Sequence, residues 1–277
     1  MTTRVRLDRE LVRRGLAPSR EAAGAAVRAG RVLVGGAVAS KPSALVSPAD
    51  PLALAGPARR WASRGGDKLA PVLDHLGVAV AGRRCLDAGA STGGFTDVLL
   101  AAGAVEVVAV DVGYGQLDLR LRRDPRVRVL DRTNVRALTA EQVGGPVDLT
   151  VADLSFISLR LVVPVLASLT RRDGDLVVLV KPQFEAGRAA VGRGGVVRDP
   201  AVRAAAVRGV AEAAAASGLG VAGVRPSPLP GPAGNLELFL HLRAGAAPLD
   251  EAALQAAVAE GETLARRGQG APEGVPR

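Results

Sequence analysis

The chain has 277 residues, 48% of them hydrophobic and 23% charged, with a formal net charge of +9. At roughly 100–200 residues per domain, this length predicts two domains. The longest apolar runs fall far short of the roughly 18–20 residues that span a bilayer, and the charged N-terminal stretch lacks the apolar centre of a signal peptide. One cysteine, Cys85, and two histidines exclude a disulfide framework and are too few ligands for a zinc site. We therefore expect a cytoplasmic protein without a metal site.

Positive charge is concentrated in the first quarter of the chain. Residues 1–66 carry twelve Lys/Arg and four Asp/Glu, a net charge of +8, whereas the remaining 211 residues carry +1. This asymmetry is typical of a surface that binds RNA or DNA, and a merely solvated basic face is the alternative. The candidate RNA-binding residues are Arg4, Arg6, Arg14, Arg20, Arg28, Arg31, Lys41, Arg59, Arg60 and Arg64.

Residues 1–58 are predicted to form a small α+β domain. Apolar residues recur at helical spacing over residues 7–12, and Ser19 precedes a second helical run from residue 20 to residue 29, which it can cap. Residues 31–38 predict a hairpin, because the paired glycines at its centre supply the positive φ angles of a two-residue turn. A last short strand follows Pro51, and the charged stretch 59–66 is the predicted interdomain linker.

From residue 67 the pattern changes to alternating strands and helices. This alternation predicts a Rossmann-like, doubly wound α/β sheet of seven strands over residues 67–247. We expect the last strand to run antiparallel. The predicted strands are Arg84–Gly89, Val105–Asp111, Val127–Leu130, Val147–Asp153, Asp175–Val180, Val221–Arg225 and Leu236–Leu242. Residues 248–277 predict one more helix and a flexible tail.

A run of small residues between the first strand and the next helix predicts a cofactor loop. Its spacing is not G-x-G-x-x-G, and Asp87 before it suits a cationic ligand better than a pyrophosphate. Asp111, about 20 residues on, can accept hydrogen bonds from both hydroxyls of a ribose. S-adenosylmethionine fits best and NAD second, while a turn or capping role is the alternative for Asp87. The candidate cofactor-binding residues are Asp87, Gly89, Ala90, Ser91, Thr92, Gly93, Gly94, Asp111, Asp131, Asn134 and Asp153.

Two of the three lysines in this arginine-rich chain accompany carboxylates at the predicted sheet edge. Asp153 and Lys181 end the fourth and fifth strands, Glu237 begins the last strand, and Lys68 opens the helix before the first strand. Parallel strands end at one edge, and the last strand begins at that edge if it runs antiparallel, so these groups are expected to converge. Lysines interleaved with carboxylates can orient and deprotonate a weakly nucleophilic hydroxyl. An ordinary ion-pair network is the alternative.

Two parts of the sequence resemble known families. Residues 3–50 resemble the small RNA-binding domain first known from ribosomal protein S-four, which implies recognition of structured RNA. The segments SRGGDKL (63–69), GASTGG (89–94), DLSFISL (153–159), KPQFE (181–185) and GNLELFL (234–240) resemble the TlyA family, related in its catalytic half to FtsJ and sometimes labelled haemolysin A. The TlyA resemblance implies Lys68, Asp153, Lys181 and Glu237 as catalytic residues, residues 89–94 as the methionine-side loop and residues 59–62 as the linker.

These observations predict an RNA-methylating enzyme. The resemblance implies an rRNA (cytidine-2'-O)-methyltransferase that uses S-adenosylmethionine and acts on the small ribosomal subunit, the large subunit or both. Neither a metal nor a membrane is expected to take part. The alternative is a non-catalytic RNA-binding or ribosome-assembly factor that retains the methyltransferase fold.

Overall fold

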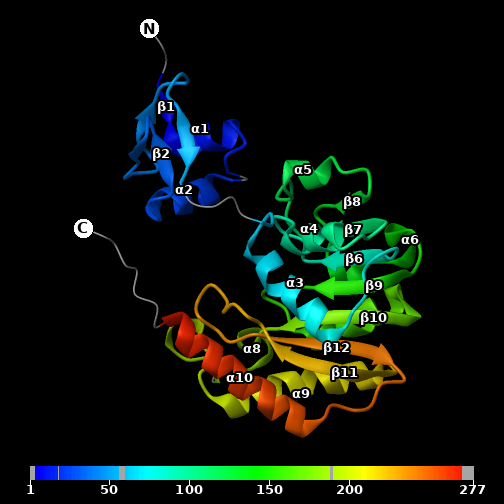
Figure 1. Cartoon of the computed structure of the whole chain (residues 1–277). Coiled ribbons are helices and arrows are strands. Elements are labelled where there is room, and N and C mark those ends of the chain that lie inside the picture. Colours follow the sequence, from blue (N-terminus) through cyan, green and yellow to red (C-terminus); the bar gives the residue numbers. More distant parts are fainter. Residues whose placement is uncertain (1–3, 18, 56–59, 188–189, 270–277) are drawn as a thin grey trace. The chain divides into compact units, whose positions relative to one another are not determined.

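A computed structural model describes residues 4–17, 19–55, 60–187 and 190–269. The chain divides into two units (Figure 1). The first contains the described residues up to Arg60 together with Gln116–Asp118, and the second contains Trp61–Gly115 and the described residues from Leu119 onward. Each unit has its own hydrophobic core.

The first unit contains the predicted helix pair and hairpin. The Ser19 side chain accepts a hydrogen bond from the Ala22 N–H and caps the second helix, as predicted. Gly35 and Gly36 have φ angles of 58° and 86°, which a hairpin turn requires. The helices are α1 (Leu7–Arg13) and α2 (Arg20–Arg28), and the strands are β1 (Val5–Arg6), β2 (Val32–Val34), β3 (Ala37–Val38), β4 (Leu45–Val46) and β5 (Leu52–Leu54). β2 pairs with β3 and β5, whereas the β1–β4 pairing was not expected.

The second unit is built on the predicted seven-stranded sheet. Its strands are β6 (Arg84–Ala88), β7 (Glu106–Val110), β8 (Val127–Leu130), β9 (Val147–Ala152), β10 (Thr170–Val180), β11 (Leu219–Pro226) and β12 (Leu238–Ala244). Their order is β11-β12-β10-β9-β6-β7-β8. β12 is antiparallel to both of its neighbours and the other pairs are parallel, so the prediction of a single antiparallel last strand is confirmed.

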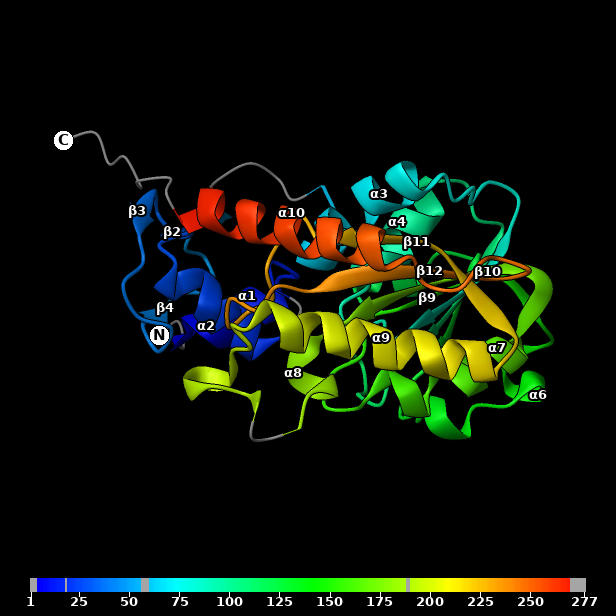
Figure 2. The same ribbon diagram turned by 90° about the horizontal axis from the view of Figure 1, so that it is seen from below.

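Helices cover both faces of this sheet (Figure 2). α3 and α4 pack together on one face, and α7 and α9 cover the other; α10 packs along β11 and α9. The helices are α3 (Arg64–Leu76), α4 (Gly94–Ala101), α5 (Leu119–Arg122), α6 (Ala140–Val143), α7 (Val163–Leu169), α8 (Pro182–Glu185), α9 (Pro200–Ala216) and α10 (Glu251–Gln269).

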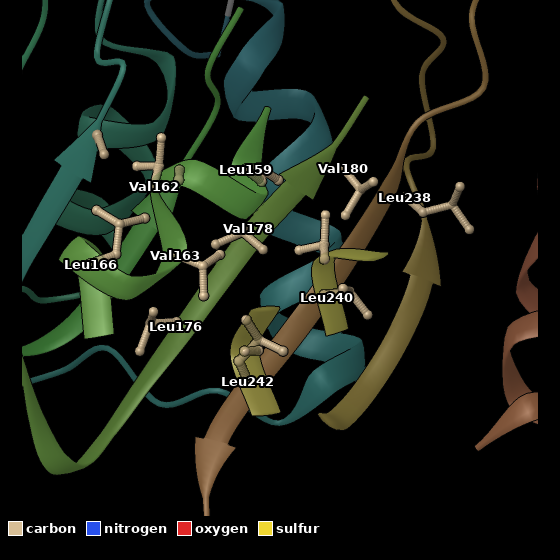
Figure 3. Close-up of a cluster of buried hydrophobic side chains, with 14 of the residues drawn as sticks. Leu159, Val162, Val163, Leu166, Leu176, Val178, Val180, Leu238, Leu240 and Leu242 are labelled. Atoms are coloured by element: carbon tan, nitrogen blue, oxygen red, sulfur yellow. The ribbon is translucent and has the colours of Figure 1, made fainter. Parts of the chain in front are cut away.

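One hydrophobic cluster of the second unit lies between the sheet and the helices α7 and α9. Branched side chains of β10 and β12 meet those of α7 there, as Figure 3 shows for Val178, Leu240 and Leu166. These three residues are fully buried. Burial of each such side chain stabilises the fold by about 1.5–3 kcal/mol, so the central strands provide a rigid base for the loops at their ends.

The predicted linker is shorter than expected at its C-terminal end. Ser63 accepts a hydrogen bond from the Gly65 N–H and caps α3, so residues 64–66 form the first helical turn rather than linker. Arg59 of the linker and the predicted tail from residue 270 onward lie outside the described residues.

Candidate active site

Polar residues follow the parallel strands of the second unit at one edge of the sheet. Asp87 is the penultimate residue of β6, and Asp111, Asp131, Asp153 and Lys181 each come directly after β7, β8, β9 and β10. Because parallel strands end at the same edge, this placement agrees with the position expected for a ligand in an open α/β sheet.

The glycine-rich loop after β6 is packed too closely for side chains at two of its positions. A Cβ atom on Gly89, whose φ is +91°, would lie 2.5 Å from the Asp153 carbonyl oxygen. A Cβ atom on Gly94 would lie 2.2 Å from Ser63 Oγ and 2.8 Å from the Gly66 nitrogen. Gly93 (φ 95°) is the left-handed N-cap of α4. The loop therefore holds the starts of α3 and α4 together and presents backbone at the sheet edge.

Asp87 is a fully buried carboxyl beneath this loop. Its Oδ2 accepts a 2.7 Å hydrogen bond from Thr96 Oγ1, whereas Oδ1 has no hydrogen-bond partner among the described residues. Burial raises the pKa of Asp87 to about 7, and Thr96 opposes the shift. A buried carboxylate with a free acceptor favours a cationic group nearby. The capping alternative is supported as well, because the Asp87 carboxylate also receives a backbone hydrogen bond from Thr96, in the first turn of α4.

Asp111 links the two neighbouring strand-end loops. Its Oδ2 accepts from the Ser91 N–H at 2.8 Å and its Oδ1 accepts from the Gly113 N–H at 2.7 Å. Each carboxylate oxygen has a second lone-pair site. The backbone bonds thus orient Asp111 and leave it able to accept from hydroxyls of a ligand.

Asp131 and Asn134 are more strongly engaged in local structure. Asp131 Oδ2 accepts from Arg122 at 2.5 Å and from the Gly115 N–H at 3.3 Å. Asn134 caps the short 3-10 helix Val135–Ala137 by accepting from the Arg136 N–H. Their assignment to the adenine end of a cofactor stays a prediction.

The four residues of the predicted reacting group form two ion pairs. Lys68 Nζ lies 2.6 Å from Glu237 Oε2 and both side chains are buried. Lys181 Nζ lies 2.6 Å from Asp153 Oδ1 and donates a 2.9 Å hydrogen bond to Ser155 Oγ. The Lys181–Asp153 contact is ionic, since Asp153 Oδ1 has no aligned hydrogen bond among the described residues. Pairing compensates part of the cost of removing these charges from water.

One cavity of about 510 Å³ is lined by both ion pairs. The glycine-rich loop, Ser63 and Phe95 lie along its wall, as do the loop residues Gly194, Gly195 and Asn235. The predicted convergence of Lys68, Asp153, Lys181 and Glu237 is therefore present, and it coincides with the predicted cofactor loop. A cavity of this size accommodates a small-molecule cofactor.

Several cavity residues were not predicted from the sequence as site residues. Ser155 Oγ accepts a hydrogen bond from Lys181 Nζ, and Gln183 Nε2 donates a 3.4 Å hydrogen bond to Glu237 Oε1. Asn235 is buried and joins two loop segments, since its Oδ1 accepts from the Val197 N–H and its Nδ2 donates to the Gly195 carbonyl. Their positions inside the segments 153–159, 181–185 and 234–240 could have marked them as site residues. Their polar character alone does not distinguish them from other polar residues of the chain.

The basic residues of the first unit fall into two groups. Arg6 and Arg20 bind the buried carboxylate of Asp8, whose pKa is lowered to about 2 chiefly by the Arg6 hydrogen bond. Arg14 binds Glu10 and the carbonyls of residues 48 and 50, and its side chain is 22% exposed. The residues Arg4, Arg28 and Lys41 are exposed, and Arg31 is half-buried.

The described residues contain no group of three or more Asp, Glu, His and Cys side chains that could hold a metal ion. In the same part of the chain, none of the helices combines the length and the apolar character that crossing a membrane requires.

Comparison with known proteins gives two family matches. The model of the FtsJ-like methyltransferase family matches residues 61–244, and that of the S4 domain matches residues 5–52. The chain is 55% identical to the 16S/23S rRNA (cytidine-2'-O)-methyltransferase TlyA of Mycobacterium tuberculosis, over 88% of this chain and 91% of the relative. It is 34% identical to Hemolysin A of Brachyspira hyodysenteriae, over 86% of this chain and 99% of the relative.

A solved structure extends the likeness to three dimensions. A Streptococcus thermophilus protein that carries a hemolysin name superimposes with a TM-score of 0.76 at 36% identity, over 97% of this chain and 99% of that chain. The same two-unit order is therefore matched by sequence and by structure along nearly the whole chain. The chain belongs to the TlyA family of FtsJ-like methyltransferases that carry an S4 domain.

Proposed function

We propose that this protein transfers a methyl group from S-adenosylmethionine to the 2'-hydroxyl of a cytidine in ribosomal RNA. The observation that carries the proposal is the pair of lysine–carboxylate contacts, Lys68–Glu237 and Lys181–Asp153, facing one cavity beside the glycine-rich loop. The names of the curated relatives and the S4 match support ribosomal RNA as the substrate class.

The residues present fit S-adenosylmethionine. The closely packed loop at Gly89 and Gly94 leaves backbone rather than side chains facing the cofactor position. Asp87 Oδ1 is a buried acceptor without a partner among the described residues, and Asp111 is oriented to accept from ribose hydroxyls. We assign the loop and Asp87 to the methionine end and Asp111 to the ribose end. When bound, the cofactor supplies a methyl group activated by its sulfonium charge.

The two ion pairs have complementary tasks in this proposal. A ribose hydroxyl is a weak nucleophile near neutral pH, so it must be oriented and relieved of its proton. Lys181, at the end of β10, is placed to hold the hydroxyl oxygen. As a proton acceptor it must first release one ammonium proton to solvent; the neutral amine then takes the hydroxyl proton, and Asp153 stabilises the ammonium that forms again. The buried Lys68–Glu237 pair forms another part of the cavity lining.

The first unit is proposed to bind the RNA. Its exposed basic residues supply phosphate contacts, which give affinity that falls with salt. Action on ribosomal subunits agrees with the expected cytoplasmic location. A non-catalytic assembly factor, which is the alternative, would not need paired lysines and carboxylates in this cavity.

The proposal is tested by incubating the purified protein with methyl-labelled S-adenosylmethionine and separated small and large ribosomal subunits. Label is expected in RNA of at least one subunit, at a cytidine 2'-oxygen located by mass spectrometry of nuclease digests. Label on a base, or tight subunit binding without any transfer, would reject the assignment, and the second result would favour the assembly factor.

A further inference from the structure

Glu185 connects the two chain segments that carry the reacting residues. It is the last residue of α8, one turn after Lys181, and its side chain is 2% exposed. Its Oε2 accepts a 2.5 Å hydrogen bond from Ser158 Oγ, and its Oε1 accepts a 2.7 Å hydrogen bond from the Leu159 N–H. Arg160 Nη2 also donates to the Glu185 carbonyl at 3.4 Å. The segment after β9 is thus fastened to the helix after β10.

Along the chain, the cavity residues of the two segments lie between the ends of β9 and β10 and the hydrogen bonds made by Glu185. Asp153 and Ser155 on the first segment both contact Lys181 at the start of the second. Phe156 on the first segment packs against Phe184 on the second, with ring centroids 5.2 Å apart. The relative position of the two segments therefore determines both the ionic contact and the aromatic contact.

Phe156 has a conformation that requires such a constraint. Its φ angle is +64°, in the left-handed region that bulky side chains rarely adopt, and its side chain is 91% exposed. Burial cannot hold an exposed ring in place. A strained backbone conformation persists where neighbouring contacts hold it in place. The hydrogen bonds of Glu185 hold the residues two and three positions after Phe156.

We propose that Glu185 is a positioning residue of the methyl-transfer site, whose carboxylate sets the Asp153–Lys181 contact and the Phe156–Phe184 pair by fastening the two segments together. The role in transfer rests on the proposed function, whereas the structural part stands on the contacts alone. A purely structural glutamate would contribute to stability without changing either the aromatic pair or the transfer step.

The four phenylalanines make the structural part directly measurable. Uniform labelling with 4-fluorophenylalanine gives four ¹⁹F signals, which single Phe→Leu variants assign. Phe156 and Phe184 report the proposed contact, while the buried pair Phe95 and Phe239, with centroids 6.1 Å apart, reports the rest of the fold. In Glu185→Ala the Phe156 and Phe184 signals should shift and broaden, and those of Phe95 and Phe239 should stay in place.

Kinetics of the same variants test the role in transfer. Glu185→Ala is expected to lower kcat by about 10- to 100-fold with little change in KM for S-adenosylmethionine, because small misplacements of reacting groups are costly. Glu185→Gln keeps an acceptor for the Leu159 N–H and a partner for the Ser158 hydroxyl, so it should recover most of the rate. Glu251→Ala is the control, since this exposed carboxylate also accepts hydrogen bonds from two residues, Arg208 and Gln255, but lies in α10 and does not line the cavity.

The outcomes separate this inference from the proposed function. If Glu185→Ala leaves the Phe156 and Phe184 signals and kcat at wild-type values, the positioning role is overturned. If the wild-type protein methylates no RNA, the proposed function fails and the fluorine signals still decide whether Glu185 sets the aromatic pair. Should Glu185→Ala not fold, Ser158→Ala removes one of the two bonds, and unchanged Phe156 and Phe184 signals in that variant would contradict the proposal.

Discussion

Lys181 has a well-defined position because two neighbours hold its ammonium group and a proline follows it. Asp153 and Ser155 contact the nitrogen, and Pro182 begins α8. Proline restricts the backbone of the residue before it to extended conformations, which matches the φ of −111° and ψ of 100° at Lys181. The side chain is therefore directed by the backbone as well as by its ion pair.

Replacing Lys181 should separate binding from transfer. We expect Lys181→Arg and Lys181→Ala to bind S-adenosylmethionine and ribosomal subunits nearly normally and to lose transfer by about 10²-fold or more, as for loss of a general base. Arginine keeps the positive charge but does not release a proton. Single-turnover rates measure the effect. A near-wild-type rate in Lys181→Arg would remove proton acceptance from this residue and make Lys68 the better candidate.

Asp87 should give cofactor binding a pH dependence. Burial raises its pKa to about 7, so the carboxyl is neutral at pH 6 and ionised at pH 8. A cationic cofactor group favours the ionised form, and affinity should rise by up to about 10-fold between these values. Calorimetry at both pH values measures this. The Asp87→Asn variant should bind S-adenosylmethionine weakly, with an affinity that does not change with pH. If the affinity of this variant still rises with pH as in the wild type, another group is responsible for the dependence.

The same raised pKa has an opposite consequence for stability. A carboxyl whose pKa is higher in the folded than in the unfolded protein makes the folded state bind more protons between about pH 4 and pH 7. Its contribution therefore lowers the free energy of unfolding as pH rises through this window. Cofactor binding and stability thus respond to Asp87 ionisation with opposite signs, and thermal unfolding of the Asp87→Asn variant should lack this contribution.

At the scale of elements, the beginnings of α3 and α4 depend on each other. Gly94→Ala would place a Cβ within 2.2 Å of Ser63 Oγ, so one of the two helix starts must move. We expect unfolding free energy to fall by about 1–3 kcal/mol, as in other overpacked sites, and cofactor affinity to fall with it. Gly187→Ala is the control, because a Cβ there meets nothing within 4 Å. Equal effects of the two substitutions on denaturant midpoint and affinity would contradict this interpretation.

The sequence predicted the elements well where their pattern is local. The periodic strands, the Ser19 cap and the Gly35-Gly36 turn are signals carried by neighbouring residues, and all are present. The β1–β4 pairing was missed because its two-residue strands have no measurable period. The two glycines at residues 65 and 66 lower helix propensity and so predict linker there, whereas the Ser63 cap starts α3 at residue 64.

Site residues that act through tertiary contacts were harder to predict. The strand-end positions of Asp153 and Lys181 followed from topology. The contacts of Glu185 depend on how the chain after β9 folds over α8, which no spacing rule describes. The bonds of Arg14 to Glu10 and to two backbone carbonyls likewise depend on tertiary contacts that the sequence pattern does not describe.

At the scale of the whole molecule, the basic residues of the first unit should differ in what they support. Arg28→Ala and Lys41→Ala should weaken binding to ribosomal subunits and each reduce the slope of log K against log salt by about 1, as expected for phosphate contacts. Arg14→Ala should instead lower stability, because its guanidinium satisfies a buried carboxylate and two carbonyls. Filter binding over a salt series and thermal unfolding distinguish the two classes. An unchanged slope in Arg28→Ala would remove Arg28 from the phosphate contacts.

The Lys68–Glu237 pair joins residues 169 positions apart in the chain. Glu237 immediately precedes β12, the last of the described strands along the chain, and β12 must enter the sheet between β10 and β11 before the pair can form. Residues of the first unit and of the glycine-rich loop are made well before Glu237. A growing chain that has not yet been extended through β12 therefore lacks the Lys68–Glu237 pair, and its site stays incomplete until that strand has entered the sheet.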